Sequence, residues 1–137
     1  MHLALGNDAA VAEWLGAKLD TQFHPPFVTM RVEDEQGKIH GAFLFNNYNG
    51  FSVEWSAFGS ETIRKPYLRA VMKYAFDQLG VLYLRATTKR SNKRVVAILP
   101  RLGFEYEGTM KRYFGPAKKD DALVFRLDRE HMKEWLK

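Results

Sequence analysis

Two groups of side chains in this sequence have types and positions suited to chemistry. The first is a carboxylate: Glu54 lies within Phe51–Phe58 (FSVEWSAF), a largely apolar run. A carboxylate in such surroundings can accept a proton as a general base. The alternative is an alternating strand on which Glu54 and Ser56 simply face solvent. Its core-facing residues would then be Val53, Trp55 and Ala57.

The second group is basic. Arg64 and Lys65 precede Pro66, and proline is favoured at the first position of a helix. Basic side chains at a helix start oppose the helix dipole, so a bound anion would relieve that conflict; otherwise the two residues are simply solvated. A further basic loop surrounds Asn92, which is itself a good N-cap residue. Its members, either solvated or placed to meet a phosphate, are Lys89, Arg90, Lys93 and Arg94.

Composition limits the classes of protein to which the chain can belong. The 137 residues fit one domain, 1–137, and the formal charge of +5 indicates a partner that carries phosphate, either nucleic acid or a phosphorylated cofactor. The absence of cysteine excludes disulfides, thiolate catalysis and Cys-ligated zinc. The four histidines show no metal-ligand spacing. No phosphate-binding glycine loop and no serine nucleophile elbow is present.

Membrane and export signals are also missing from the sequence. No apolar run approaches the roughly 18 residues that a membrane helix needs. The first residues lack the basic start and apolar block of a signal peptide. We therefore expect a cytoplasmic protein without a membrane partner.

Hydrophobic spacing and turn residues predict an alternation of helices and strands. Helices are expected over 8–19, over about 64–79 and over 92–102, the last two ended by Gly80 and Gly103. Strands are expected over 27–33, 39–45, 51–58, 81–86, 104–112 and 122–127, followed by a helical turn or two over 129–136. Asn49-Gly50 indicates a type I′ hairpin turn, and 87–91 is expected to be a basic loop. One more strand, before or within the first helix, is expected without bounds.

The stretch 92–111 (NKRVVAILPRLGFEYEGTMK) resembles the ribosomal-protein N-acetyltransferase branch of the GNAT superfamily. Residues in register with that branch are Asn92, Leu99, Leu102, Gly103, Phe104, Glu107 and Gly108, with Lys111 at the usual arginine. Residues 74–80 resemble the end of the family's cofactor-binding helix, and 123–125 with 134–136 resemble the branch's ending. The segment 43–55 (FLFNNYNGFSVEW) is similar to short bacteriophage GNAT proteins. The resemblance covers 27–136.

This resemblance implies an α/β protein with the GNAT fold, in which a central mixed, mostly antiparallel sheet is flanked by helices on both faces. It implies an N-acyltransferase that moves an acetyl group directly from acetyl-CoA to a primary amine of a protein or small molecule, without a metal. Glu54 would be the general base, and Asn92 would position the amine or bind the pantetheine arm. The cofactor-binding residues would be Trp55, Ser56, Ala57, Phe58, Arg64, Lys65, Asn92 and Arg94.

The chain departs from the family pattern in several places, among them Val95 at the pattern's serine and Ser56 where the phage-like relatives often have histidine. The equivalent of the family's glycine-containing pyrophosphate loop is Ser60–Tyr67, which contains no glycine, and Leu99 stands where many members have a tyrosine acid. These departures favour an alternative function, a catalytically inactive GNAT-fold protein that is structural, part of a virion, or nucleic-acid-binding. Positive charge spread from Arg31 to Lys137 does not define one groove-facing element, which argues against nucleic acid as the partner. In either case we expect a monomer or a homodimer.

Overall fold

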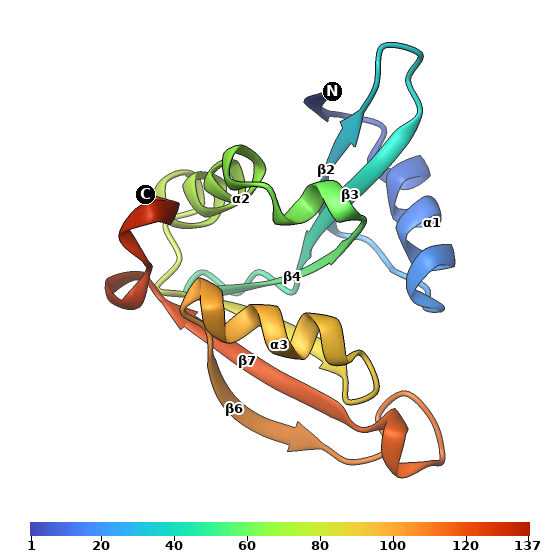
Figure 1. Cartoon of the computed structure of the whole chain (residues 1–137), viewed down its shortest axis with the longest axis vertical. Helices are drawn as coiled ribbons and strands as arrows, with labels where there is room; N and C mark the ends of the chain where they lie inside the picture. Colours follow the sequence, from blue (N-terminus) through green and yellow to red (C-terminus); the bar gives the residue numbers. More distant parts are fainter.

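One seven-stranded sheet organises the fold, and the computed structural model describes residues 1 to 137. The strands lie in the order β1-β2-β3-β4-β5-β7-β6 (Figure 1). Neighbouring strands are antiparallel except for β4 and β5, which run parallel. The strands are β1 His2–Leu5, β2 Phe27–Glu33, β3 Ile39–Asn46, β4 Ser52–Phe58, β5 Tyr83–Lys89, β6 Glu105–Met110 and β7 Ala122–Asp128. The helices are α1 Asp8–Leu19, α2 Lys65–Met72 and α3 Lys93–Leu102.

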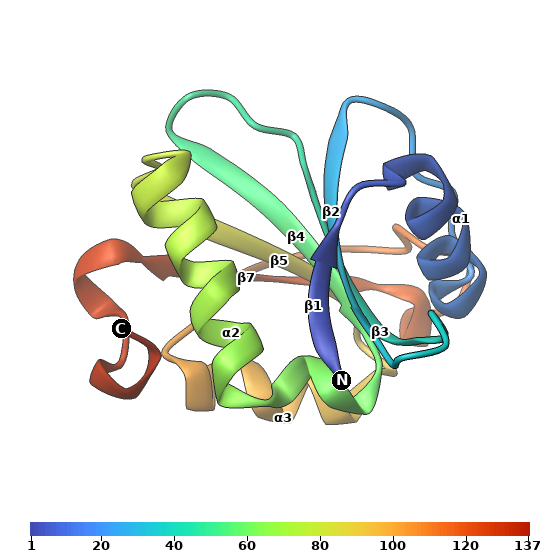
Figure 2. The same ribbon diagram turned by 90° about the horizontal axis from the view of Figure 1, so that it is seen from above.

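Helices cover both faces of the sheet, because apolar side chains alternate between the faces along the central strands. On β3, Ala42 and Leu44 belong to a small buried cluster with α1, whereas Phe43 and Phe45 belong to the large cluster with α2 and α3. Figure 2 shows α1 on one side of the sheet and α2 on the other. The predicted fold class, a mixed and mostly antiparallel sheet between helices, is therefore confirmed.

An aromatic stack lies at the centre of the large cluster. The ring of Trp55 on β4 lies between the rings of Phe43 on β3 and Phe104, which immediately precedes β6. The ring centroids are 5.8 and 5.9 Å apart, and the planes differ by only 11° and 13°. The indole Nε1 of Trp55 is buried without a hydrogen-bond partner. The stack therefore joins β3, β4 and the segment before β6 by ring packing, without a hydrogen bond from the indole.

Gly59 ends β4 in a backbone conformation that suits glycine, with φ at 112°. Its backbone passes so close to His40 and Gly41 of β3 that a Cβ atom would collide with them. The chain then enters a 3₁₀ turn, Ser60–Ile63, which leads into α2. The close approach keeps the end of β4 against β3.

The bounds of α1 and β2 agree with the sequence prediction, and the unassigned strand is β1, a four-residue edge strand paired with β2. The strand predicted over 81–86 instead occupies Tyr83–Lys89, because Thr87, Thr88 and Lys89 find partners on β7. The predicted basic loop at 87–91 was therefore wrong in its first three residues. Sequence periodicity ends at Ala86, whereas the pairing with β7 continues the strand.

Two other details differ from prediction, and one agrees with it. The type I′ turn does not form, because only Gly50 of the Asn49-Gly50 pair has a positive φ, and the Asn49 side chain instead accepts the N–H groups of Phe51 and Ser52. The helix predicted to run to residue 79 is α-helical only to Met72 and continues as a π-helical turn over Lys73–Gln78. The helical turn or two predicted over 129–136 is confirmed, as two 3₁₀ turns, Arg129–His131 and Glu134–Leu136.

Candidate active site between the parallel strands

The two parallel strands separate part of the way along the sheet. Their pairing begins at Ser52 opposite Tyr83 and ends at Trp55 opposite Ala86. Beyond that point β4 continues beside β3 over Ser56–Phe58, while β5 continues beside β7 over Thr87–Lys89. The facing edges of β4 and β5 therefore have backbone groups that no neighbouring strand satisfies, and such groups are ready to pair with a bound molecule.

A cleft of about 310 Å³ lies at this separation, and 12 of its 20 lining residues are hydrophobic. Its walls come from β4, β5, the 3₁₀ turn after β4, and the inward face of α3. Six of the eight residues predicted to bind the cofactor line this cleft: Trp55, Ser56, Ala57, Phe58, Asn92 and Arg94. Residues that the sequence placed apart, on one strand and one helix start, are thus brought together in one apolar cleft.

Arg64 and Lys65 do not line the cleft. The side chain of Arg64 is 65% exposed and pairs with Glu61 at 3.3 Å, and Lys65 Nζ lies 5.6 Å from the centroid of the Trp135 ring. Glu61 therefore supplies negative charge at the start of α2, and the conflict with the helix dipole is relieved within the chain. Binding of the cofactor by these two side chains remains a prediction.

Glu54 faces the side of the sheet opposite to Trp55, as the alternating interpretation of the strand requires. The side chain is half-buried, and its two oxygens accept hydrogen bonds from different residues. Thr87 Oγ1 donates to Oε1 across 3.0 Å, and Asn47 Nδ2 donates to Oε2 across 3.3 Å. Glu54 itself does not line the cleft, but Thr87 does. The carboxylate is therefore connected to the cleft through one hydroxyl group.

Thr87 was not predicted as a site residue, because the sequence pattern placed it in a loop. The signal that was available is the position of Thr87 directly after the buried run 81–86, where an extension of the strand points it away from Ala86 and toward the face that carries Glu54. The partner strand β7, which holds this extension in place, lies more than 30 residues further along the chain.

Asn92 caps the first turn of α3. Its Oδ1 accepts the N–H of Val95 at 3.4 Å, which is the N-cap role that the sequence left open. Asn92 also lines the cleft, and its Nδ2 has no partner within the chain. The cap uses the oxygen of the amide and leaves the nitrogen available to donate to a bound molecule.

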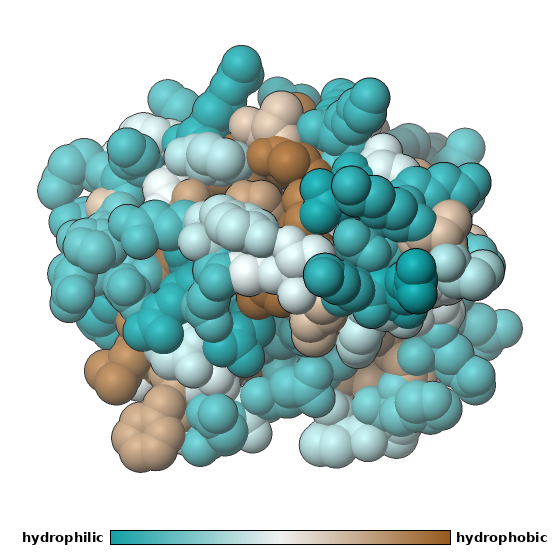
Figure 3. Space-filling view, turned by 90° about the horizontal axis from the view of Figure 1, so that it is seen from below, coloured by the Kyte–Doolittle hydropathy of each residue, from teal (hydrophilic) through white to brown (hydrophobic).

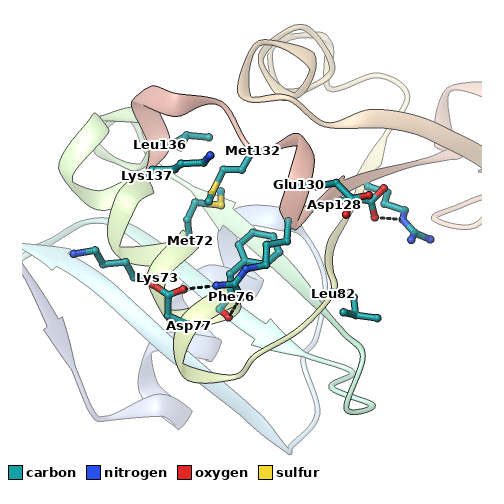
Figure 4. A pocket seen from close by; sticks show the side chains of 12 residues that line it. Met72, Lys73, Phe76, Asp77, Leu82, Asp128, Glu130, Met132, Leu136 and Lys137 are labelled. Carbon is teal, nitrogen blue, oxygen red and sulfur yellow. Dashed lines mark hydrogen bonds and ion pairs between the residues drawn. The ribbon is translucent and has the colours of Figure 1, made fainter.

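A second and larger cavity, about 690 Å³, opens beside the π-helical turn and the C-terminal turns (Figure 4). Its charged groups are largely paired: Arg129 donates to the Phe76 carbonyl and to Asp77, and Arg126 pairs with Asp128 at 2.8 Å. None of the predicted site residues lines it. We therefore place the candidate site in the smaller cleft, where strand geometry and predicted residues coincide.

The groups with shifted pKa values lie outside the cleft. A hydrogen bond from His40 holds the pKa of Asp34 below its usual value, helped by the Lys38 N–H. Burial raises the pKa of Tyr74, and the negative charge of Asp8 adds to that effect. The structure contains no group of three or more His, Asp or Glu residues arranged to hold a metal ion. None of its helices is long and apolar enough to cross a membrane.

The sheet order, the separated parallel strands and the helices on both faces define the fold of the GNAT acetyltransferases. A putative acetyltransferase from Acinetobacter baylyi superposes with a TM-score of 0.70 at 16% identity, covering 95% of this chain and 93% of that one. A spermidine N-acetyltransferase mutant from Vibrio cholerae gives 0.69 at 14% identity, with 93% and 95% covered. The ribosomal-protein-S5-alanine acetyltransferase from Vibrio fischeri gives 0.65 at 18% identity, with 91% and 70% covered. No protein-family model and no curated protein matches the sequence.

Proposed function

We propose that the protein is an acetyl-CoA-dependent N-acetyltransferase that transfers the acetyl group directly to a primary amine of a protein or small molecule. The observation that carries this proposal is the cleft at the separation of β4 and β5, which gathers six of the predicted cofactor-binding residues on a GNAT fold. We further propose that residues 1–137 act as one domain, in the cytoplasm, as a monomer or homodimer. Kinship with short bacteriophage GNAT proteins remains a proposal.

The cleft suits the arm of an acyl-CoA. The pantetheine arm contains two amide groups, and the free backbone edges of Ser56–Phe58 and Thr87–Lys89 offer the N–H and C=O groups that amides pair with. The free Nδ2 of Asn92 adds one donor, and the apolar lining suits the remainder of the arm. Arg94 adds a positive charge to the lining, which suits a phosphate of the cofactor. The bound thioester would supply the activated acetyl group.

Glu54 serves in this proposal as the base that removes a proton from the amine. An alkyl ammonium has a pKa of about 10.4 and must be deprotonated before it can attack a carbonyl. Thr87 lines the cleft and donates to Glu54, so its hydroxyl can take a proton from the amine while it passes its own to the carboxylate. This relay lets a carboxylate outside the cleft act on a group inside it.

One observation favours an alternative. No tyrosine lines the cleft, and buried Leu99 occupies part of its wall on α3. The thiolate of coenzyme A must then leave without a nearby phenol, which is feasible at a modest cost because thiols are far more acidic than alcohols, with a pKa of about 8.5 for the thiol of cysteine. If that cost is too high, the protein is a catalytically inactive GNAT-fold protein.

The deciding experiment measures the melting temperature with and without millimolar acetyl-CoA, followed by coenzyme A release with a panel of peptide and polyamine acceptors. Ligand at about 100 times its dissociation constant adds roughly 2.7 kcal/mol to the free energy of unfolding, which is a shift of several degrees. A shift together with acceptor-dependent release that Glu54→Gln abolishes supports the proposal. A shift without release at any acceptor supports the inactive alternative, and no shift contradicts cofactor binding itself.

A further inference from the structure

The excess positive charge of the protein is concentrated at one end of the molecule. Residues 89–94 and 111–121 together carry eight of the 21 Lys and Arg residues but only two of the 16 acidic residues. Their net charge is +6, whereas that of the whole chain is +5, so the remainder of the chain is close to neutral. Charge that appears dispersed along the sequence is therefore gathered by the fold.

The two segments are held against each other. The N–H of Arg90 donates to the carbonyl of Asp121 across 2.8 Å, and Arg90 Nε lies 3.5 Å from the Asp121 carboxylate. Lys89 Nζ lies 5.7 Å from the centroid of the Phe114 ring. In Figure 1 the loop before α3 and the loop between β6 and β7 lie side by side. We call the exposed side of these two loops the basic surface.

The two acidic residues of the basic surface accept hydrogen bonds from its backbone. Asp121 is only 5% exposed, and its carboxylate accepts the N–H of Arg112 at 2.8 Å. Asp120 accepts the N–H of Ala117 at 3.1 Å. Of the eight basic side chains, only Arg90 has an acidic partner. The other seven carry uncompensated charge: Lys89, Lys93, Arg94, Lys111, Arg112, Lys118 and Lys119.

An exposed aromatic ring lies among these charges. Tyr113 is 60% exposed, and its ring meets that of Phe114 edge to face at 4.9 Å. Such a ring next to several cations is the combination by which proteins bind single-stranded nucleic acid, with bases stacked on aromatic rings and phosphates held by basic side chains. Paired bases in a duplex have no face free for stacking, and an acidic peptide has no base that could stack on the ring. The face that carries β6 and β7 is mostly hydrophilic (Figure 3), so no large apolar patch competes for the partner.

We infer that the basic surface binds single-stranded nucleic acid, with Tyr113 as a stacking platform. The inference does not depend on the proposed acetyl transfer. The basic surface borders the cleft, because Asn92 and Arg94 at the start of α3 line it. A bound strand would therefore pass the mouth of the candidate active site.

The test measures the fluorescence anisotropy of labelled 20-nucleotide oligo(dT) and oligo(U), without acetyl-CoA, at 50 and 200 mM salt. If about four phosphates are held, the affinity falls about 50-fold between these two salt concentrations. Lys118→Glu with Lys119→Glu should weaken binding at least 10-fold and flatten the salt dependence, and Tyr113→Ala should weaken it about 10-fold, whereas Tyr113→Phe should not.

The matched control is Lys38→Glu with Lys73→Glu, which changes the net charge equally at exposed lysines that are far from both loops and have no acidic partner. Melting temperatures confirm that all variants are folded. Absence of binding at 50 mM salt, or equal loss in the control, overturns the inference. Equal affinity for poly-glutamate, together with no effect of Tyr113→Ala, would assign the surface to acidic proteins instead.

Discussion

The hydroxyl of Thr87, which lines the cleft, and the carboxylate of Glu54, which does not, are joined by a 3.0 Å hydrogen bond on the face of the sheet opposite to Trp55. Trp55 and Ala86 form the last pair between β4 and β5, and Thr87 is the first residue of β5 beyond it. The hydrogen bond therefore lies at the point where the two strands begin to separate. Because of this position, removal of the hydrogen bond is the most direct test of how the site works.

Thr87→Val removes the hydroxyl with little change of shape. We expect the rate constant kcat for acetyl transfer to fall by about 10-fold or more, while Glu54→Gln lowers it by about 10²–10⁴, the usual contribution of a general base. Thr88→Val is the matched control, because Thr88 also lines the cleft but its hydroxyl bonds to no residue. Full activity of Thr87→Val beside an inactive Glu54→Gln would show that Glu54 acts without the relay.

Asn92 offers a way to separate helix capping from ligand binding. Asn92→Asp keeps the oxygen that caps α3 and loses the amide donor, so the melting temperature should hold while the dissociation constant for acetyl-CoA rises. Asn92→Ala should weaken both, with a loss of about 0.5–2 kcal/mol in the free energy of unfolding. Calorimetry and denaturant unfolding measure the two effects. Unchanged binding in Asn92→Asp would confine this residue to capping.

Two arginines predicted to bind the cofactor occupy different settings. Arg94 lines the cleft, whereas Arg64 is exposed and paired with Glu61 outside it. We expect Arg94→Ala to reduce the shift in melting temperature caused by acetyl-CoA more than Arg64→Ala does. The reverse order would show that the start of α2 binds the pyrophosphate, as the family resemblance implies.

Trp55 should respond very differently to two substitutions. Trp55→Phe keeps a ring between Phe43 and Phe104 and removes the buried Nε1 donor that has no partner, so the change in stability should be small. Trp55→Ala empties the stack and should cost about 3–5 kcal/mol. Urea unfolding measures both. A large loss in Trp55→Phe would mean that Nε1 has a partner, such as a bound water.

Asp34 and His40 give the protein one defined response to acid. The hydrogen bond from His40 lowers the pKa of Asp34 below its ordinary 3.8, so the ionised form is favoured in the folded state. This stabilisation is complete above the unfolded pKa and disappears as the pH falls through the lower, folded pKa. Asp34→Asn should therefore destabilise the protein at pH 7, and its difference from the wild type should shrink below about pH 4. A difference that does not change with pH would mean that Asp34 stabilises the protein only through the turn to which it belongs, and not through its charge.

The sequence predicted those elements whose signals are local. The bounds of α1 follow from helical spacing before a turn, and six of the predicted site residues fall on segments whose own patterns identify them. Glu54 was correctly assigned to a strand, and of the two interpretations left open for it the alternating one gives its side chain the face opposite to Val53 and Trp55.

Features that depend on distant partners were missed or were predicted only in part. Thr87 was assigned to a loop because β7 supplies the pairing that extends β5. The short edge strand β1 has only its pairing with β2 to define it. The basic loop around Asn92 was identified, but its union with 111–121 was not, because Arg90 and Asp121, which join the two halves of the basic surface, lie 31 positions apart in the sequence. In each case a long-range contact decides what the local pattern leaves open.

The separation of β4 and β5 gives this sheet four edges in place of two. The outer edges, β1 and β6, are short, and the exposed glutamates at 105 and 107 discourage β6 from pairing with another molecule. The inner edges are enclosed by α3 and the turn after β4, so no second sheet can reach them, although a single extended ligand such as the arm of acetyl-CoA can. The protein can thus use strand-like backbone recognition for a ligand without presenting a template for aggregation.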